Sequence, residues 1–124
     1  MTPQHAIFRQ VMITCSGIGD TYDYVPDAGT KYPFIFIGGT SNTGGHSSDL
    51  IGEVNQVINV YAERTQRSDL DTLITNLYNK ISRINKAFDY SINVRQITHN
   101  LIPDNTDVKP LLHAIVDVRF QYSR

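Results

Sequence analysis

Hydrophobic residues recur at helical spacing near the start of the chain. They fall at steps of one, three, one and three, which places them on one side of a helix: Ile7, Phe8, Val11, Met12 and Cys15. Pro3 suits a first turn, where a missing amide N–H does no harm. Gly17 and Gly19 follow and end a helix at little cost. The pattern therefore predicts a helix over residues 3–15 that buries one apolar stripe.

A second helix is predicted from Ser68 onward, with Ser68 as N-cap and Asp71 three residues later. Its apolar stripe extends over four turns, through Leu70, Leu73, Ile74, Leu77, Tyr78, Ile81 and Ile84. The basic residues near its end, Lys80, Arg83 and Lys86, have the positions that compensate a helix dipole. The same residues could alternatively touch a phosphate backbone.

Residues 21–25 and 32–38 predict two short strands joined by a turn. In the turn, 26–30, Pro26 presets φ and Gly29 is free to adopt a positive φ. The run 34–37 is aromatic and β-branched and is apolar on both faces. Such a run is typical of a central strand.

The segment 38–48 contains four glycines and no large apolar side chain. Because it has nothing to bury, it predicts a mobile loop.

Three further strands are predicted over 53–62, 92–97 and 111–122, where polar and apolar residues alternate. Gln96 and Ile97 break the alternation and suggest a bulge. Residues 103–107 between the last two strands have the composition of a turn.

This order of elements, α-β-β-loop-β-α-β-β, predicts the α+β class. We expect one domain over residues 1–124, with a mostly antiparallel sheet of four to five strands and both helices packed on one face. The 124 residues suit a single core.

Charge and composition narrow the function classes. The formal net charge is −1, so broad electrostatic capture of nucleic acid or of an anionic membrane is disfavoured. No apolar run approaches the ~18–20 residues of a membrane span, and we expect no membrane partner. The single cysteine, Cys15, excludes an intrachain disulfide framework and lies on an apolar stripe, so we expect a core residue.

Motifs for catalysis or for cofactors are absent from the sequence. The segment 39–44 has the spacing of the first part of a P-loop, but Gly45 and His46 stand where lysine and serine or threonine belong. No two histidines have metal-ligand spacing, and His113 is expected to be a solvated or cross-strand partner. The aspartates gather in predicted turns, which they cap. We therefore expect no enzyme, no cofactor and no metal.

The run Val25-Pro26-Asp27, followed by 32–38 (Tyr-Pro-Phe-Ile-Phe-Ile-Gly), resembles the "VYD-x-x-P … PYPYV-x-I-G" opening of tail-completion or tail-terminator proteins of long-tailed bacteriophages. The resemblance covers roughly residues 20–122 in element order. Where many members end the long strand with tryptophan, this chain has Tyr61-Ala62 and no tryptophan at all.

The resemblance implies a structural protein of the virion, in a phage or prophage, at the head-proximal end of the tail and assembled in the host cytoplasm. Its implied partners are other copies in a six-membered ring, the major tail tube protein and the head–tail connector or head completion protein, with passive contact to DNA passing through. Outward polar residues in and beside 38–48 are the expected assembly contacts: Gly39, Thr40, Ser41, Asn42, Gly44, His46 and Asp49. The alternative is a small ligand-binding or enzymatic domain that uses 38–48 as a lid over a pocket near His46 and Asp49.

Overall fold

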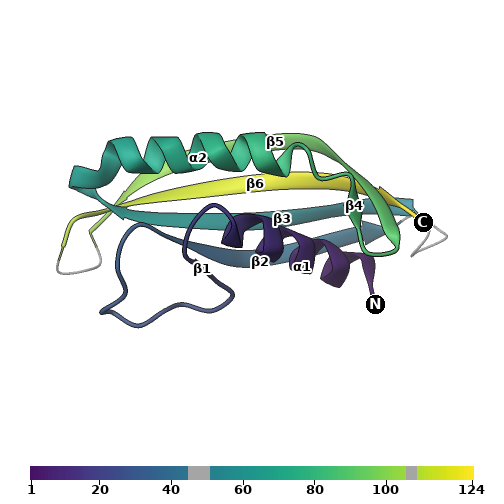
Figure 1. Ribbon diagram of the computed structural model, residues 1–124, viewed down its shortest axis with the longest axis horizontal. Helices are drawn as coiled ribbons and strands as arrows, with labels where there is room; N and C mark the ends of the chain where they lie inside the picture. The colour runs from purple at the N-terminus through teal and green to yellow at the C-terminus, as the bar shows by residue number, and fades with distance from the viewer. Residues whose placement is uncertain (45–50, 106–108) are drawn as a thin grey trace.

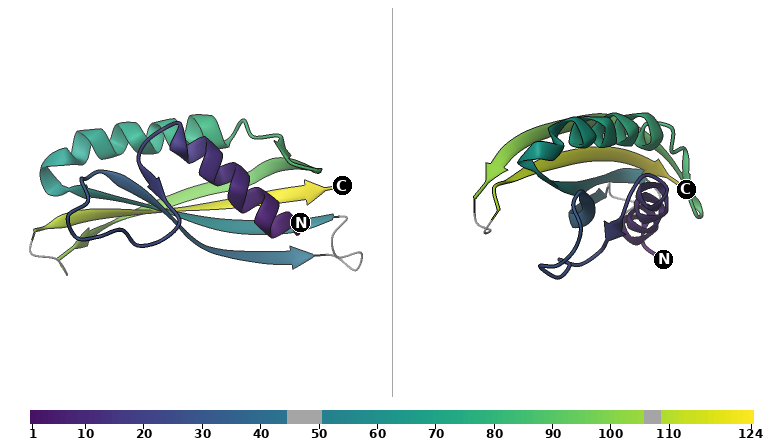
Figure 2. Two further views of the ribbon diagram at one scale, coloured as in Figure 1. Left: turned by 60° about the horizontal axis from the view of Figure 1, so that its bottom comes forward. Right: turned by 60° about the vertical axis from the view of Figure 1, so that its left-hand side comes forward.

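In the computed structural model, which describes residues 1–44, 51–105 and 109–124, two helices cover one face of a single curled six-stranded sheet (Figures 1 and 2). The helices are α1 (Pro3–Ser16) and α2 (Arg67–Ile81). The strands are β1 (Thr21–Tyr22), β2 (Phe34–Gly44), β3 (Ile51–Glu63), β4 (Lys86–Ala87), β5 (Tyr90–Asp104) and β6 (Leu111–Ser123). Their order in the sheet is β1-β2-β3-β6-β5-β4, and every pairing except β1 with β2 is antiparallel. The predicted α+β class is confirmed, but there are six strands where four to five were expected.

The core lies between the helices and the sheet face that carries the even-numbered residues of β3 and β6. Both apolar stripes predicted for the helices point into it, with Ile7, Val11, Leu77 and Ile81 all buried. Cys15 is fully buried among them, and burial raises the pKa of its thiol to about 12. The thiol is therefore a packing group.

The helix ends differ in part from the predictions. α1 begins as expected, with Pro3 in its first turn and the Thr2 side chain accepting a hydrogen bond from the His5 N–H. Ser68 was predicted to be the N-cap of α2, but it lies inside that helix. A 3-10 turn, η1 (Arg64–Gln66), precedes α2 and carries a capping box in which Gln66 Oε1 accepts a hydrogen bond from the Glu63 N–H. α2 ends at Ile81, so of the three predicted basic residues only Lys80 lies in its last turn. Ile84, which was predicted to extend the stripe, lies beyond the helix but is still buried.

Of the two strands predicted over 21–25 and 32–38, the first is shorter than expected, and the two do not pair as neighbouring antiparallel strands. β1 has two residues and runs parallel to β2, with Thr21 opposite Ile35. The turn at 27–30 does form, through a 3.0 Å bond from the Thr30 N–H to the Asp27 carbonyl, but Gly29 does not adopt a positive φ. β2 is next to this short edge strand and is not central. Its run 34–37 is apolar on both faces because the segment 23–33 folds against the face opposite the helices.

Two strands are longer than predicted. β2 continues to Gly44, so residues 38–44 of the segment 38–48 that was expected to be a loop form a strand, while 45–48 lie outside the described residues. β5 continues through Pro103 and Asp104, which were expected to form a turn. The predicted bulge is confirmed, because the β5–β6 register shifts between Val94 and Gln96.

Gly52 occupies a position with no room for a side chain. A Cβ there would lie 2.5 Å from Tyr122 Oη and 2.7 Å from the Thr43 carbonyl oxygen, which belongs to the paired backbone of β2. Gly52→Ala is therefore expected to lower the free energy of unfolding by about 1–3 kcal/mol through overpacking. Gly29, around which a Cβ would meet nothing within 4 Å, is the control: Gly29→Ala should raise stability by about 0.4–1 kcal/mol by restricting the unfolded chain. Urea unfolding of both variants measures the difference, and equal midpoints would contradict the expectation.

Candidate assembly surfaces

Both outer edges of the sheet are unpaired over most of their length in the part of the chain that the structure describes. β1 covers β2 only at Ile35 and Phe36, and β4 covers β5 only at Tyr90 and Ser91. Figure 1 shows the long strands β2 and β5 on opposite sides of the pair β3 and β6. An unpaired strand edge presents backbone N–H and C=O groups that another chain can bind.

The predicted assembly residues Gly39, Thr40, Ser41, Asn42 and Gly44 lie in the free stretch of β2, and the first four are exposed. Two side chains from elsewhere reach this stretch. Gln4 Nε2 donates to the Thr40 carbonyl at 3.1 Å, and Tyr122 Oη donates to Asn42 Oδ1 at 3.4 Å. His46 and Asp49, the other two candidates, lie outside the described residues.

A buried glutamine explains why this glycine-rich segment is a strand. The register of β2 against β3 shifts between Ile37 and Thr40, which leaves the carbonyls of Gly38 and Gly39 outside the regular ladder. Gln56, fully buried on β3, donates from Nε2 to these carbonyls at 3.1 and 3.3 Å. The bonds satisfy groups that would otherwise need water, so the strand continues past the bulge.

The sheet face opposite the helices carries a row of aromatic rings across three strands. Tyr61 stacks between Phe34 and His113, with ring centroids 5.3 and 4.2 Å away. His113 Nε2 lies 2.7 Å from Asn59 Oδ1, which can only accept, so this nitrogen carries the proton. Burial lowers the pKa of His113, and the negative charge of Asp104 partly opposes that shift. His113 is thus a cross-strand partner, as its position predicted.

A groove of about 350 Å³ lies on this face, between the segment 23–33 and the sheet. Its lining includes the aromatic residues Tyr32, Phe34 and Tyr61 and the acidic residues Asp27 and Asp104. Burial, followed by the charge of Asp104, raises the pKa of the Tyr61 hydroxyl. Aromatic rings beside carboxylates suit a cationic group on a partner.

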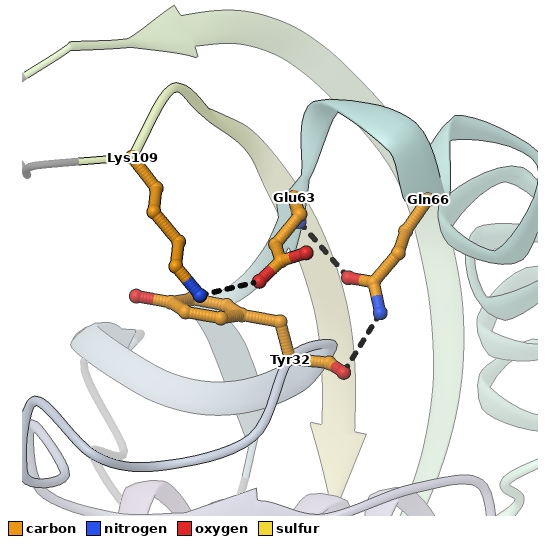
Figure 3. A network of polar contacts seen from close by, with 4 residues as sticks. All are labelled: Tyr32, Glu63, Gln66 and Lys109. Atoms are coloured by element: carbon orange, nitrogen blue, oxygen red, sulfur yellow. Dashed lines mark hydrogen bonds and ion pairs between the residues drawn. The ribbon is translucent and has the colours of Figure 1, made fainter.

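Polar contacts fix the segment 23–33 to the start of α2 (Figure 3). Gln66 Nε2 donates to the Tyr32 carbonyl at 2.9 Å, while its Oε1 accepts from the Glu63 N–H. Lys109 Nζ pairs with Glu63 Oε1 at 3.2 Å. The network joins four parts of the chain at one end of the sheet, so the groove has a preformed wall.

Within residues 1–44, 51–105 and 109–124, no three His, Cys, Asp or Glu side chains gather as a metal site requires. No helix in these ranges is long and apolar enough to cross a membrane.

The free edge of β5 was missed by the sequence reasoning. Its residues 96–102 contain no Lys, Arg, Asp, Glu or Pro, the residues that commonly protect an edge from pairing, whereas Arg95 precedes this stretch and Pro103 and Asp104 follow it. The stretch 37–44 in β2 also lacks these residue types. The lack of charged residues and proline in these stretches can be seen in the sequence. It indicates a pairing surface only when the strand is known to lie at an edge of the sheet.

Comparison with models of known protein families finds no match to this chain. Comparison with curated proteins finds no significant relative either.

Proposed function

We propose that this chain is a structural protein of a long-tailed phage or prophage that forms a ring on the finished tail tube. The ring stops polymerisation of the tube and provides the joint to the head connector. The observation that carries the proposal is a pair of unpaired edge stretches, 37–44 in β2 and 96–102 in β5, which lie on opposite sides of one curled sheet and contain no Lys, Arg, Asp or Glu. The resemblance of residues 25–38 to tail-terminator proteins gives the ring its place in the virion.

Two different surfaces on opposite sides of a subunit allow a head-to-tail contact between copies. Repeated contacts of this kind close into a ring when the rotation between neighbours divides a full turn, and otherwise form an open filament. The sheet is curled (Figure 2), a shape that suits subunits arranged side by side around a common axis. Six copies, the number that the resemblance implies, would fit a tail tube of the same symmetry.

A tube cap acts by occupying an end, so it needs docking faces rather than catalytic groups. The groove that is lined by aromatic residues and by Asp27 and Asp104 gives the ring one such face toward the tube protein or the connector. The net charge of −1 suits only passive contact with DNA passing through.

A ligand-binding or enzymatic domain is the alternative class. Residues 40–44 are paired with β3, so this part of the segment 38–48 is held in the sheet and does not form the lid that this alternative invoked; residues 45–48 lie outside the described residues. The aromatic groove is then the place for a ligand, because it combines apolar surface with a few polar groups.

Tube capping in vitro tests the proposal. Purified protein added to growing tubes of the cognate tail tube protein is expected to stop elongation and to appear as a ring at one end in negative-stain images. Heat-denatured protein at the same concentration is the control for nonspecific effects. Tubes that continue to grow with bare ends would contradict the proposal and favour the ligand-binding alternative.

A further inference from the structure

The backbone groups that face outward on the two free edges can be identified from the ladders. On β2, the Ile35 N–H donates outward to the Asp20 carbonyl, and Ile35 is opposite Val60 of β3. Outward and inward pairs alternate in an antiparallel ladder. The β2 residues opposite even-numbered residues of β3 therefore direct their backbone N–H and C=O groups away from the sheet. These residues are Ile37, Thr40 and Asn42. The Thr40 carbonyl accepts from Gln4 Nε2, which agrees with this assignment, and a neighbouring strand would have to displace this exposed bond.

The same reasoning applies to β5. The Ile92 N–H donates outward to the Asn85 carbonyl, and Ile92 is opposite Tyr122 of β6. After the bulge between Val94 and Gln96, the residues opposite even-numbered β6 positions are Ile97, His99 and Leu101. These three residues direct their backbone N–H and C=O groups away from the sheet.

We propose that neighbouring copies of this chain join by antiparallel pairing of the free β2 edge of one copy with the free β5 edge of the next. The inference rests on the ring of the proposed function and names the contact that closes it. β2 and β5 run in opposite directions within one sheet, because three antiparallel pairings separate them. A rotation about an axis near the strand direction preserves those directions, so β5 meets the next β2 antiparallel.

The side chains of the outward-facing residues fit this contact. Thr40 and Asn42 are opposite the core-facing Gln56 and Val54, and His99 and Leu101 are opposite the core-facing Val116 and Ala114. All therefore lie on the helix-covered face. Hydrogen-bonded partners across a ladder share a face, so the pairing continues the helix-covered face of one copy into that of the next. Neither 37–44 nor 96–102 places like charges in contact, because neither contains Lys, Arg, Asp or Glu.

Proline at an outward-facing position removes an N–H that the neighbour would use while leaving the internal ladder intact. Asn42→Pro blocks the β2 edge and Leu101→Pro blocks the β5 edge. Asn42→Ala and Leu101→Ala are the matched controls, since they remove the same side chains and keep the N–H. Native mass spectrometry and light scattering are expected to show oligomers for the wild type and both alanine variants, and monomers for each proline variant.

Mixing the two proline variants gives the sharpest result. Asn42→Pro keeps its β5 edge and Leu101→Pro keeps its β2 edge, so the mixture is expected to form a one-to-one dimer and nothing larger. Oligomers of either proline variant alone, or a mixture that stays monomeric, would overturn the proposed contact. A wild-type chain that forms no oligomer at any concentration, and none at the end of a tail tube, would overturn it as well.

Amide hydrogen exchange on the wild type gives a readout that does not depend on the folding of the variants. The N–H groups of Asn42 and Leu101 should exchange slowly in the oligomer and quickly in the dilute monomer; fast exchange in the oligomer would overturn the contact. Oligomers with the expected protection that fail to cap tubes would instead contradict the proposed function and leave the contact standing.

Discussion

The proposed function predicts that deleting the gene for this protein from the phage or prophage that encodes it leaves filled heads separate from tails, many of them abnormally long. Tube subunits add to an open end until a surface that cannot be extended covers it, so loss of the cap leaves elongation unchecked. Head assembly uses other proteins and should be normal. Electron microscopy of lysates would measure tail lengths and the fraction of heads with tails.

Complementation supplies the control for that experiment. Adding purified wild-type protein to the mutant lysate should restore joining of heads to tails of normal length, whereas the Asn42→Pro variant should not. Tails of normal length already attached to heads in the deletion mutant would contradict the proposed function.

Leu77→Ala is expected to lower the free energy of unfolding by about 2–5 kcal/mol. Leu77 lies in the middle of α2, is fully buried and belongs to the single core between the helices and the sheet. Truncation there removes apolar contacts and leaves a cavity that the surrounding helix and sheet can fill only in part. Denaturant unfolding measures the loss.

Asn76→Ala is the matched control for this substitution, because Asn76 is the neighbouring residue on the exposed side of the same helix. Its expected effect is within about 0.5 kcal/mol. A loss below about 1 kcal/mol for Leu77→Ala would mean that the stripe of α2 contributes little to the core, contrary to its burial.

The residues of the two proposed assembly edges were selected only in part from the sequence. Gly39 to Asn42 were selected because the segment is polar and glycine-rich, and the structure places them on a surface open to a partner. The reason for their selection was wrong, since the segment was taken for a mobile loop. The edge of β5 was not predicted, because the strand was expected to end at residue 97 and 103–107 has the composition of a turn. In the structure β5 is paired with β6 as far as Asp104.

The sequence by itself determined the elements whose apolar residues repeat over many positions. Both helical stripes, the alternation along β3 and β6 and the β5 bulge follow from local periodicity, because burial of one face requires that spacing wherever the partner lies. Tertiary structure decided what depends on distant partners. The strand over 38–44 exists because Gln56, on another strand, satisfies the carbonyls of Gly38 and Gly39. The parallel course of β1, the aromatic groove and the identity of the free edges depend on which strands become neighbours, and no local pattern encodes strand order.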